Sequence, residues 1–191
     1  MIPRRSALVT SAGRTGRVVG PVRAGIALVL VAVAVGLTGC SPGPAPKPTP
    51  TPLFTSEAEA FQAAERVYRD YVDAANARND GDKDASPERF MAGRALQDSL
   101  EATEARKTAK IALTGHFQLV RFQGTSADLR PRSLAIVAKI CVDVSGTRLI
   151  DASGSDATPL GRAERVPVEV QFNEAKSGLK IYRADALAEP C

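Results

Sequence analysis

The side chains that most often perform chemistry are few in this chain, which contains one histidine and three cysteines. A lone histidine can serve a catalytic triad, but no nucleophile motif of the G-x-S-x-G type accompanies His116. His116 follows Gly115 at the expected start of a strand, where we expect a residue at the surface. The sequence therefore predicts no catalytic residue here.

Three aspartates, Asp80, Asp82 and Asp84, have the 1-3-5 spacing of ligands in a calcium-binding loop. Ala85 stands where such a loop needs glycine, and Met91 stands where it needs a bidentate glutamate. A solvated acidic loop fits the segment better. A zinc site is also disfavoured, because there is no second histidine and two cysteines are expected to be bonded. We expect neither a metal nor a cofactor.

The N-terminal segment has the order of a secretory signal peptide. Residues 1–23 contain five arginines and no acidic residue, and residues 24–36 are apolar and uncharged. This apolar run is shorter than a membrane-spanning helix, which needs about 20 residues. We therefore predict export of the chain.

The leader ends in Leu37-Thr38-Gly39-Cys40, which resembles the bacterial lipobox. The resemblance implies that diacylglycerol is attached to the Cys40 thiol and that residues 1–39 are then removed as the signal peptide. Two acyl chains suffice for stable anchoring where one is marginal. The alternative is an ordinary cleaved signal peptide, with Cys40 as a bystander.

The exported part is nearly neutral and begins with a spacer. It holds 20 basic residues, because five of the 25 lie in the leader, against 21 acidic residues, a net charge of −1. Such a domain has no long-range attraction for phosphate backbones, so we expect no nucleic-acid binding. Residues 40–52 contain Cys40 and a segment with proline at every second position. It predicts a semi-rigid polyproline II spacer with a reach of roughly 37 Å.

Residues 53–191 have the length of one domain and begin with a helical half. Ser56 and Glu59 predict a capping box that opens an amphipathic helix ending near Asn79. Ser86 and Pro87 start the chain again, with a short and a longer helix separated near Gly93. The apolar positions of this second part are Phe90, Met91, Leu96, Leu100, Ile111 and Leu113.

The second half alternates apolar and polar residues, which is typical of strands. We expect strands at residues 115–123, 134–144, 166–172 and 179–187, in one antiparallel sheet with one buried face. Cys141 falls on the exposed face of a central strand. Pro167 predicts that its strand lies at an edge or carries a bulge. Helices followed by an antiparallel sheet predict an α+β fold.

This order of helices and sheet resembles the NTF2-like (cystatin-like) cone, with N-terminal helices packed on a curved antiparallel sheet. More narrowly, the chain resembles small NTF2-like lipoproteins of high-GC Gram-positive bacteria. The resemblance rests on the lipobox, the proline spacer, the helix with Tyr68 and Tyr71, the strand end at residues 140–146 and the terminal Cys191. It covers nearly the whole chain and implies no assigned chemistry. It also implies a homodimer formed through the sheet.

Cys141 and Cys191 remain after Cys40 is lipidated. An even pair in an oxidising compartment predicts a disulfide, and two free thiols are the alternative. The closed loop would stabilise the fold by roughly 4 kcal/mol in the chain-entropy model.

Two functions remain open. The first is a non-enzymatic, membrane-anchored module outside the cytoplasm that binds an envelope protein or a small apolar ligand, or acts as a scaffold. The second is an isomerase or hydrolase with its site in the cone. NTF2-like enzymes such as ketosteroid isomerase and scytalone dehydratase place Tyr, Asp and His inside the cone, so Tyr68, Tyr71 and His116 are the candidate cavity-lining residues. The aliphatic faces of the strands favour the first function.

Overall fold

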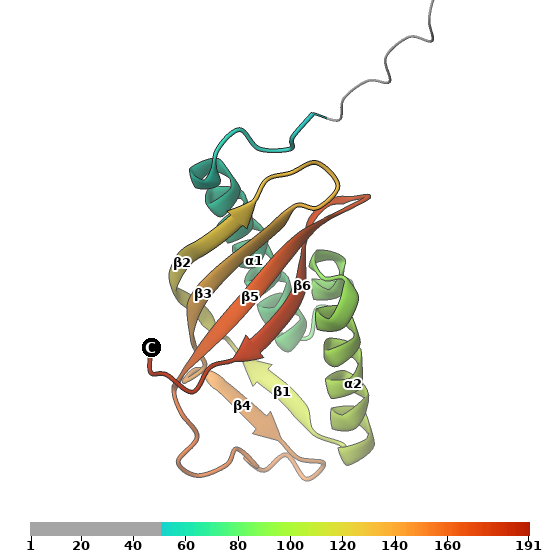
Figure 1. Ribbon diagram of the computed structural model, residues 1–191. Coiled ribbons are helices and arrows are strands. Elements are labelled where there is room, and N and C mark those ends of the chain that lie inside the picture. The colour runs from blue at the N-terminus through green and yellow to red at the C-terminus, as the bar shows by residue number, and fades with distance from the viewer. Residues whose placement is uncertain (1–50) are drawn as a thin grey trace, which may run out of the picture. The chain divides into compact units, whose positions relative to one another are not determined.

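The computed structural model describes residues 51–191. The predicted signal peptide of residues 1–39, Cys40 and most of the spacer lie outside the described residues. In the described part, three helices precede six strands (Figure 1). The elements are α1 (Glu57–Asn79), the 3-10 helix η1 (Pro87–Phe90), α2 (Gly93–Ala109), β1 (Ala112–Gly115), β2 (Gln118–Asp128), β3 (Ala135–Asp143), β4 (Thr147–Ile150), β5 (Arg165–Ala175) and β6 (Gly178–Ala186).

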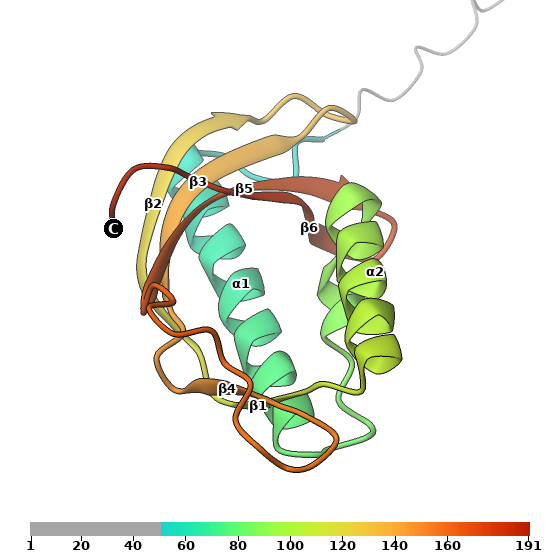
Figure 2. The same ribbon diagram turned by 90° about the horizontal axis from the view of Figure 1, so that it is seen from below.

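The four long strands form one antiparallel sheet in the order β2-β3-β5-β6, and β1 pairs with β4 in a second, two-stranded sheet. Ile140 of β3 lies opposite Val168 of β5 and Phe122 of β2, so apolar side chains of neighbouring strands share one face. α1 lies inside the curve of the larger sheet, and α2 lies beside β6 (Figure 2). The predicted α+β class is confirmed.

The hydrophobic core lies between α1 and the concave face of the larger sheet. Ala60, Ala64, Tyr68 and Val72 recur every four residues along one side of α1, and none is more than 6% exposed. They pack against apolar residues of the central strands β3 and β5: Ile136, Ala138, Ile140, Val170 and Phe172. The described residues thus carry a hydrophobic core of their own, as an independently folding domain requires.

The start of α1 uses half of the predicted capping box. The Glu59 backbone N–H donates to the Ser56 hydroxyl at 3.2 Å, which satisfies one free donor of the first turn. The Glu59 carboxylate does not return to the Ser56 backbone. It accepts instead from the backbone N–H and the hydroxyl of Thr55, at 2.8 and 2.9 Å.

The single strand predicted for residues 115–123 is wrong, because the chain turns there from one sheet into the other. α1 holds this corner through side-chain amides. Asn76 donates to the Phe117 carbonyl at 2.9 Å and accepts from the Phe117 N–H at 3.1 Å, and Asn79 donates to the Gly115 carbonyl at 3.0 Å. These bonds replace the ladder bonds that a continuous strand would make.

Gly115 also allows the two sheets to meet. Its φ is +76°, and a Cβ atom there would lie 2.1 Å from the Gly146 carbonyl oxygen in the turn before β4. β4 is a four-residue strand that the sequence did not reveal. Its register with β1 begins at the Gly115–Thr147 pair.

Pro167 was expected to mark an edge strand or a bulge, but β5 is an interior strand between β3 and β6. The one register shift of β5 lies between Gln171 and Phe172, away from Pro167. The Pro167 carbonyl accepts from the Leu187 N–H at 2.9 Å, just past the end of β6. In an antiparallel pair a residue turns its N–H and C=O to the same neighbour. The N–H that Pro167 lacks would therefore point to the end of β6, where the pairing between β5 and β6 stops.

The second helical segment divides near Gly93 as predicted, into η1 and α2. Gly93 has a φ of +54°, and a Cβ atom there would lie 2.4 Å from the Tyr182 ring. α2 is shallowly packed, since Ala95 is its one buried residue. Leu100, expected among the apolar positions, is 53% exposed on α2.

Candidate binding hollow

An apolar hollow of about 410 Å³ opens beside α1, at the end of the concave face where the two sheets meet. Its volume lies in the lower part of the range of roughly 300–1,000 Å³ that small-molecule sites occupy. Most of its lining is aliphatic or aromatic, and two polar side chains join it. We call it the Tyr68 hollow; its main lining residues are Tyr68, Phe117, Val142, Val144, Val166, Val168, Thr147 and Arg162.

The aliphatic wall follows from the period of two in β3 and β5. Val142 pairs with Val166 across the two strands, and both side chains point to the concave face. Val166 and Val168 are only partly buried, because α1 does not cover this end of the sheet completely. The strand pattern thus leaves apolar surface open to a ligand.

Tyr68 forms the helical side of the hollow and is only 6% exposed. Among residues 51–191 the Tyr68 hydroxyl has no hydrogen-bond partner. Since no fully buried side-chain oxygen of this region lacks a partner, the hydroxyl must keep some contact with open space. The hydroxyl therefore opens toward the hollow. Burial raises the pKa of Tyr68 well above its ordinary value, so the group is a neutral donor at physiological pH.

Arg162 brings the one positive charge to this lining. Its Nη1 donates to the Thr147 hydroxyl at 3.0 Å, and its Nη2 donates to the carbonyls of Val144 and Thr147 at 2.8 and 3.0 Å. Thr147 is itself buried, at 3% exposed, and donates to the Val144 carbonyl at 2.8 Å. The guanidinium is thus fixed against the turn between β3 and β4.

A smaller cavity of about 250 Å³, the Tyr71 cavity, lies between α1, η1 and α2. Phe117 lines both spaces, and its ring centroid is 6.2 Å from that of Tyr71. Arg78 and Glu88 form an ion pair in this cavity, and Arg106 also lines it. Burial, followed by the Glu88 charge, raises the pKa of Tyr71.

The three candidate cavity residues do not converge. Tyr68 and Tyr71 contact each other edge-on, with ring centroids 5.5 Å apart, but they line different spaces. His116 lines neither space. Its Nε2 lies 2.7 Å from Asp80 Oδ2, and both side chains are more than half exposed. His116 is therefore the surface residue that its position after Gly115 predicted.

The acidic loop makes its own local contacts. Asp82 Oδ1 accepts from the Asp84 N–H at 2.9 Å, a turn contact typical of a solvated loop. Within residues 51–191, no three His, Cys, Asp or Glu side chains are grouped so as to hold a metal ion. In the same range no helix is long and apolar enough to cross a membrane.

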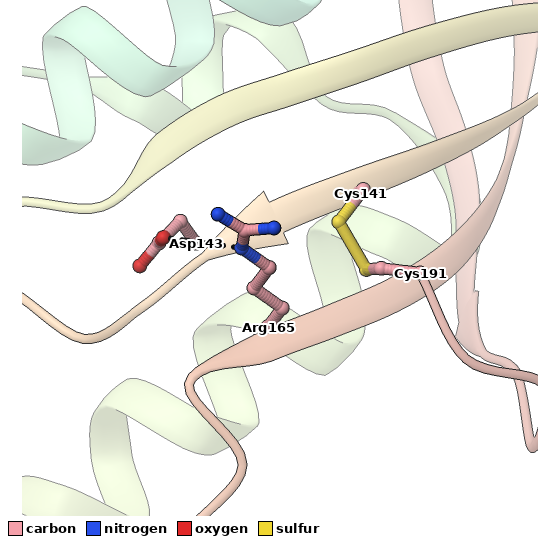
Figure 3. The surroundings of a disulfide bond; sticks show 4 residues. All are labelled: Cys141, Asp143, Arg165 and Cys191. Atoms are coloured by element: carbon pink, nitrogen blue, oxygen red, sulfur yellow. Dashed lines mark hydrogen bonds and ion pairs between the residues drawn. A yellow bond between two sulfur atoms is a disulfide. The ribbon is translucent and has the colours of Figure 1, made fainter.

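The predicted disulfide is present between Cys141 and Cys191, whose Cα atoms are 5.6 Å apart (Figure 3). Cys141 is only 2% exposed, so the expectation that it lies on an exposed face is wrong. The C-terminal residues cross this face and cover it. Besides the disulfide, Glu189 accepts from Lys139 Nζ at 2.7 Å. Asp143 and Arg165 lie beside the disulfide, and Asp143 Oδ2 is 3.5 Å from Arg165 Nε.

Arg162 and Thr147 are the site residues that sequence reasoning missed. Arg162 lies in the irregular segment between β4 and β5, where no periodicity marks a residue as buried or exposed. Thr147 starts a strand of only four residues. No signal in the sequence singles out Arg162, since Glu164 two residues later makes an ordinary surface arginine equally compatible.

Comparisons with known proteins find a similar fold and no family. No protein-family model matches the chain, and no curated protein matches it. Among solved structures, the intermembrane space region of the chloroplast protein ARC6 is similar, with a TM-score of 0.50 and 15% sequence identity. The match covers 68% of this chain and 97% of that one. At this identity the likeness concerns the fold alone.

Proposed function

We propose that this chain is a lipoprotein on the outer face of a bacterial cell membrane, whose residues 53–191 form an NTF2-like cone that binds a small apolar ligand. The leader and lipobox support the address, and the proline spacer supports presentation away from the bilayer. The observation that carries the binding function is the Tyr68 hollow. It offers an open aliphatic wall formed by Val142, Val144, Val166 and Val168.

The energetics favour a ligand with an apolar chain or ring. Each methylene that leaves water for such a surface contributes about 0.8 kcal/mol. A ligand that covers the valines therefore gains affinity without any specific polar contact. An unidentified envelope protein stays the alternative binding partner, and a homodimer formed through the sheet stays a prediction from the resemblance.

The lining of the hollow explains why binding is favoured over catalysis. Among residues 51–191, the lining includes neither a carboxylate nor a histidine or cysteine. A cone isomerase needs a proton acceptor at the substrate, and a neutral buried tyrosine does not supply one. His116 and Asp80 lie together at the surface, away from this lining.

Fluorescence of the neutral dye Nile red tests the proposal. The protein is residues 40–191 with Cys40→Ser, so that no attached lipid competes. We expect the fluorescence of Nile red to increase saturably, with one dye molecule bound per chain. Val168→Trp fills the hollow and should abolish it. Val120→Trp is the matched control, because Val120 is 49% exposed on β2 and lies outside the hollow. Equal loss in both variants, or no enhancement by the unsubstituted protein, contradicts the proposal.

A further inference from the structure

Arg162 places a positive charge at the edge of the Tyr68 hollow, and this charge bears on which apolar ligands can bind there. Arg162 lies half-buried against an aliphatic wall, yet it forms no ion pair with any residue of 51–191. The nearby carboxylate of Asp156 pairs instead with Arg148, at 3.6 Å. Asp156 still attracts Arg162, but from beyond ion-pair distance. A cation that is partly removed from water and has no carboxylate in direct contact favours an incoming anion.

The geometry leaves part of the guanidinium available. Three protein oxygens, two backbone carbonyls and the Thr147 hydroxyl, receive bonds from Nη1 and Nη2. A guanidinium has five N–H donors, so the Nε–H and one Nη1–H have no acceptor among the described residues. The three bonds hold the group in place, and binding an anion therefore costs little side-chain entropy.

We propose that the ligand of the Tyr68 hollow is a single-chain amphiphile with an anionic head group, a carboxylate or a phosphate. Its chain covers the valines and its head group pairs with Arg162, with the neutral Tyr68 hydroxyl as a further donor. The volume of about 410 Å³ suits one chain better than two. This inference rests on the proposed function and specifies its ligand class.

Displacement of Nile red from residues 40–191 with Cys40→Ser measures the preference directly. The competitors are decanoate, decyl phosphate, neutral decanol and cationic decyltrimethylammonium, which have unbranched alkyl chains of nine (decanoate) or ten carbons and differ in the head group. We expect the two anions to bind about tenfold or more tightly than decanol, and the cation most weakly. The tighter of the two anions identifies the head group.

Substitutions locate the charge that is responsible. Arg162→Gln should weaken decanoate about tenfold, to the level of decanol, and leave decanol unchanged. Arg165→Gln is the matched control: Arg165 does not line the hollow, and its substitution leaves the Arg148–Asp156 pair in place. Arg106→Gln tests the Tyr71 cavity in the same way, and both of these variants should keep the preference.

The outcomes separate the two proposals. If all four competitors bind the unsubstituted protein equally, or if Arg106→Gln removes the anion preference instead, the head-group inference is overturned while apolar binding stands. If Nile red does not bind at all, the proposed function fails and this inference fails with it. The comparison of head groups is made on protein without substitutions in residues 53–191. It therefore stays decisive even if Arg162→Gln destabilises the turn between β3 and β4.

Discussion

The Arg78–Glu88 ion pair joins the end of α1 to the start of η1. Nη1 and Nη2 of Arg78 both donate to the Glu88 carboxylate, and Arg78 Nη2 also donates to the Ala85 carbonyl at 3.0 Å. The Glu88 side chain is 19% exposed, so solvent screens this pair less than the exposed pairs of the surface. One arginine thus closes the loop between two helices.

Replacing Glu88 should change both stability and its dependence on pH. The hydrogen bond from Arg78 lowers the pKa of Glu88 below its ordinary value of 4.5. A carboxyl of this kind stabilises the fold above its unfolded-state pKa, and the contribution is lost as the pH falls through the folded-state pKa. We expect Glu88→Gln to lower the free energy of unfolding by about 1–2 kcal/mol at pH 7 and to flatten its decline below about pH 5.

Urea denaturation at several pH values measures both effects. Glu65→Gln is the matched control, because Glu65 pairs with Arg69 four residues away on α1 and its partner is 55% exposed. Exposed pairs of this type contribute about 0.3–0.5 kcal/mol. If Glu88→Gln and Glu65→Gln have equal effects at pH 7, the loop-closing role of the Arg78–Glu88 pair is refuted.

At the scale of elements, the last residues of the chain act as a strap across the convex face of the sheet. Residues 187–191 make three contacts with two interior strands: the Leu187 bond to Pro167, the Glu189 ion pair with Lys139, and the disulfide to Cys141. The disulfide closes a sequence separation of 50 residues. The strap thus ties the end of the fold to the middle of the sheet.

Removing the disulfide should therefore destabilise the fold substantially. For Cys141→Ala with Cys191→Ala we expect a loss of about 2–4 kcal/mol in the free energy of unfolding, since the unfolded chain regains the entropy of an open loop. Glu189→Gln, which leaves the disulfide intact, should cost well under about 1 kcal/mol. Urea denaturation compares them. Alkylation of two thiols in the unreduced, unsubstituted protein would show that the bond is absent.

The elements that sequence predicted well are those whose own pattern decides their burial. α1 has a cap, an apolar stripe and a clear end at Asn79, and β3 and β5 alternate over much of their length. The corner after Gly115 was mistaken because Asn76 and Asn79 fix it from a distant helix. Arg162 was missed for a similar reason, since its role depends on the turn at Thr147 to which it bonds. Contacts between distant segments leave no periodic signal.

At the scale of the whole molecule, the described domain has a closed and an open end. α1 covers most of the concave face, and its alanines bring the helix close to β3. At the other end, where the two sheets meet, the Tyr68 hollow leaves apolar surface open. A lipid anchor and a spacer with a reach of roughly 37 Å would hold such a domain within reach of membrane lipids.

Anchoring through Cys40 is the prediction on which this arrangement depends. In a bacterial host that processes lipoproteins, Cys40→Ala removes the thiol that would receive diacylglycerol. We therefore expect the protein to leave the membrane fraction for the medium or to accumulate unprocessed. Cys141→Ala with Cys191→Ala is the matched control: it removes the two disulfide-bonded cysteines of the folded domain, keeps the Cys40 thiol and should leave the protein in the membrane fraction. Fractionation followed by immunoblotting distinguishes the two. Full membrane retention of processed Cys40→Ala protein would mean that Cys40 carries no anchor and that the domain is held at the membrane by other means.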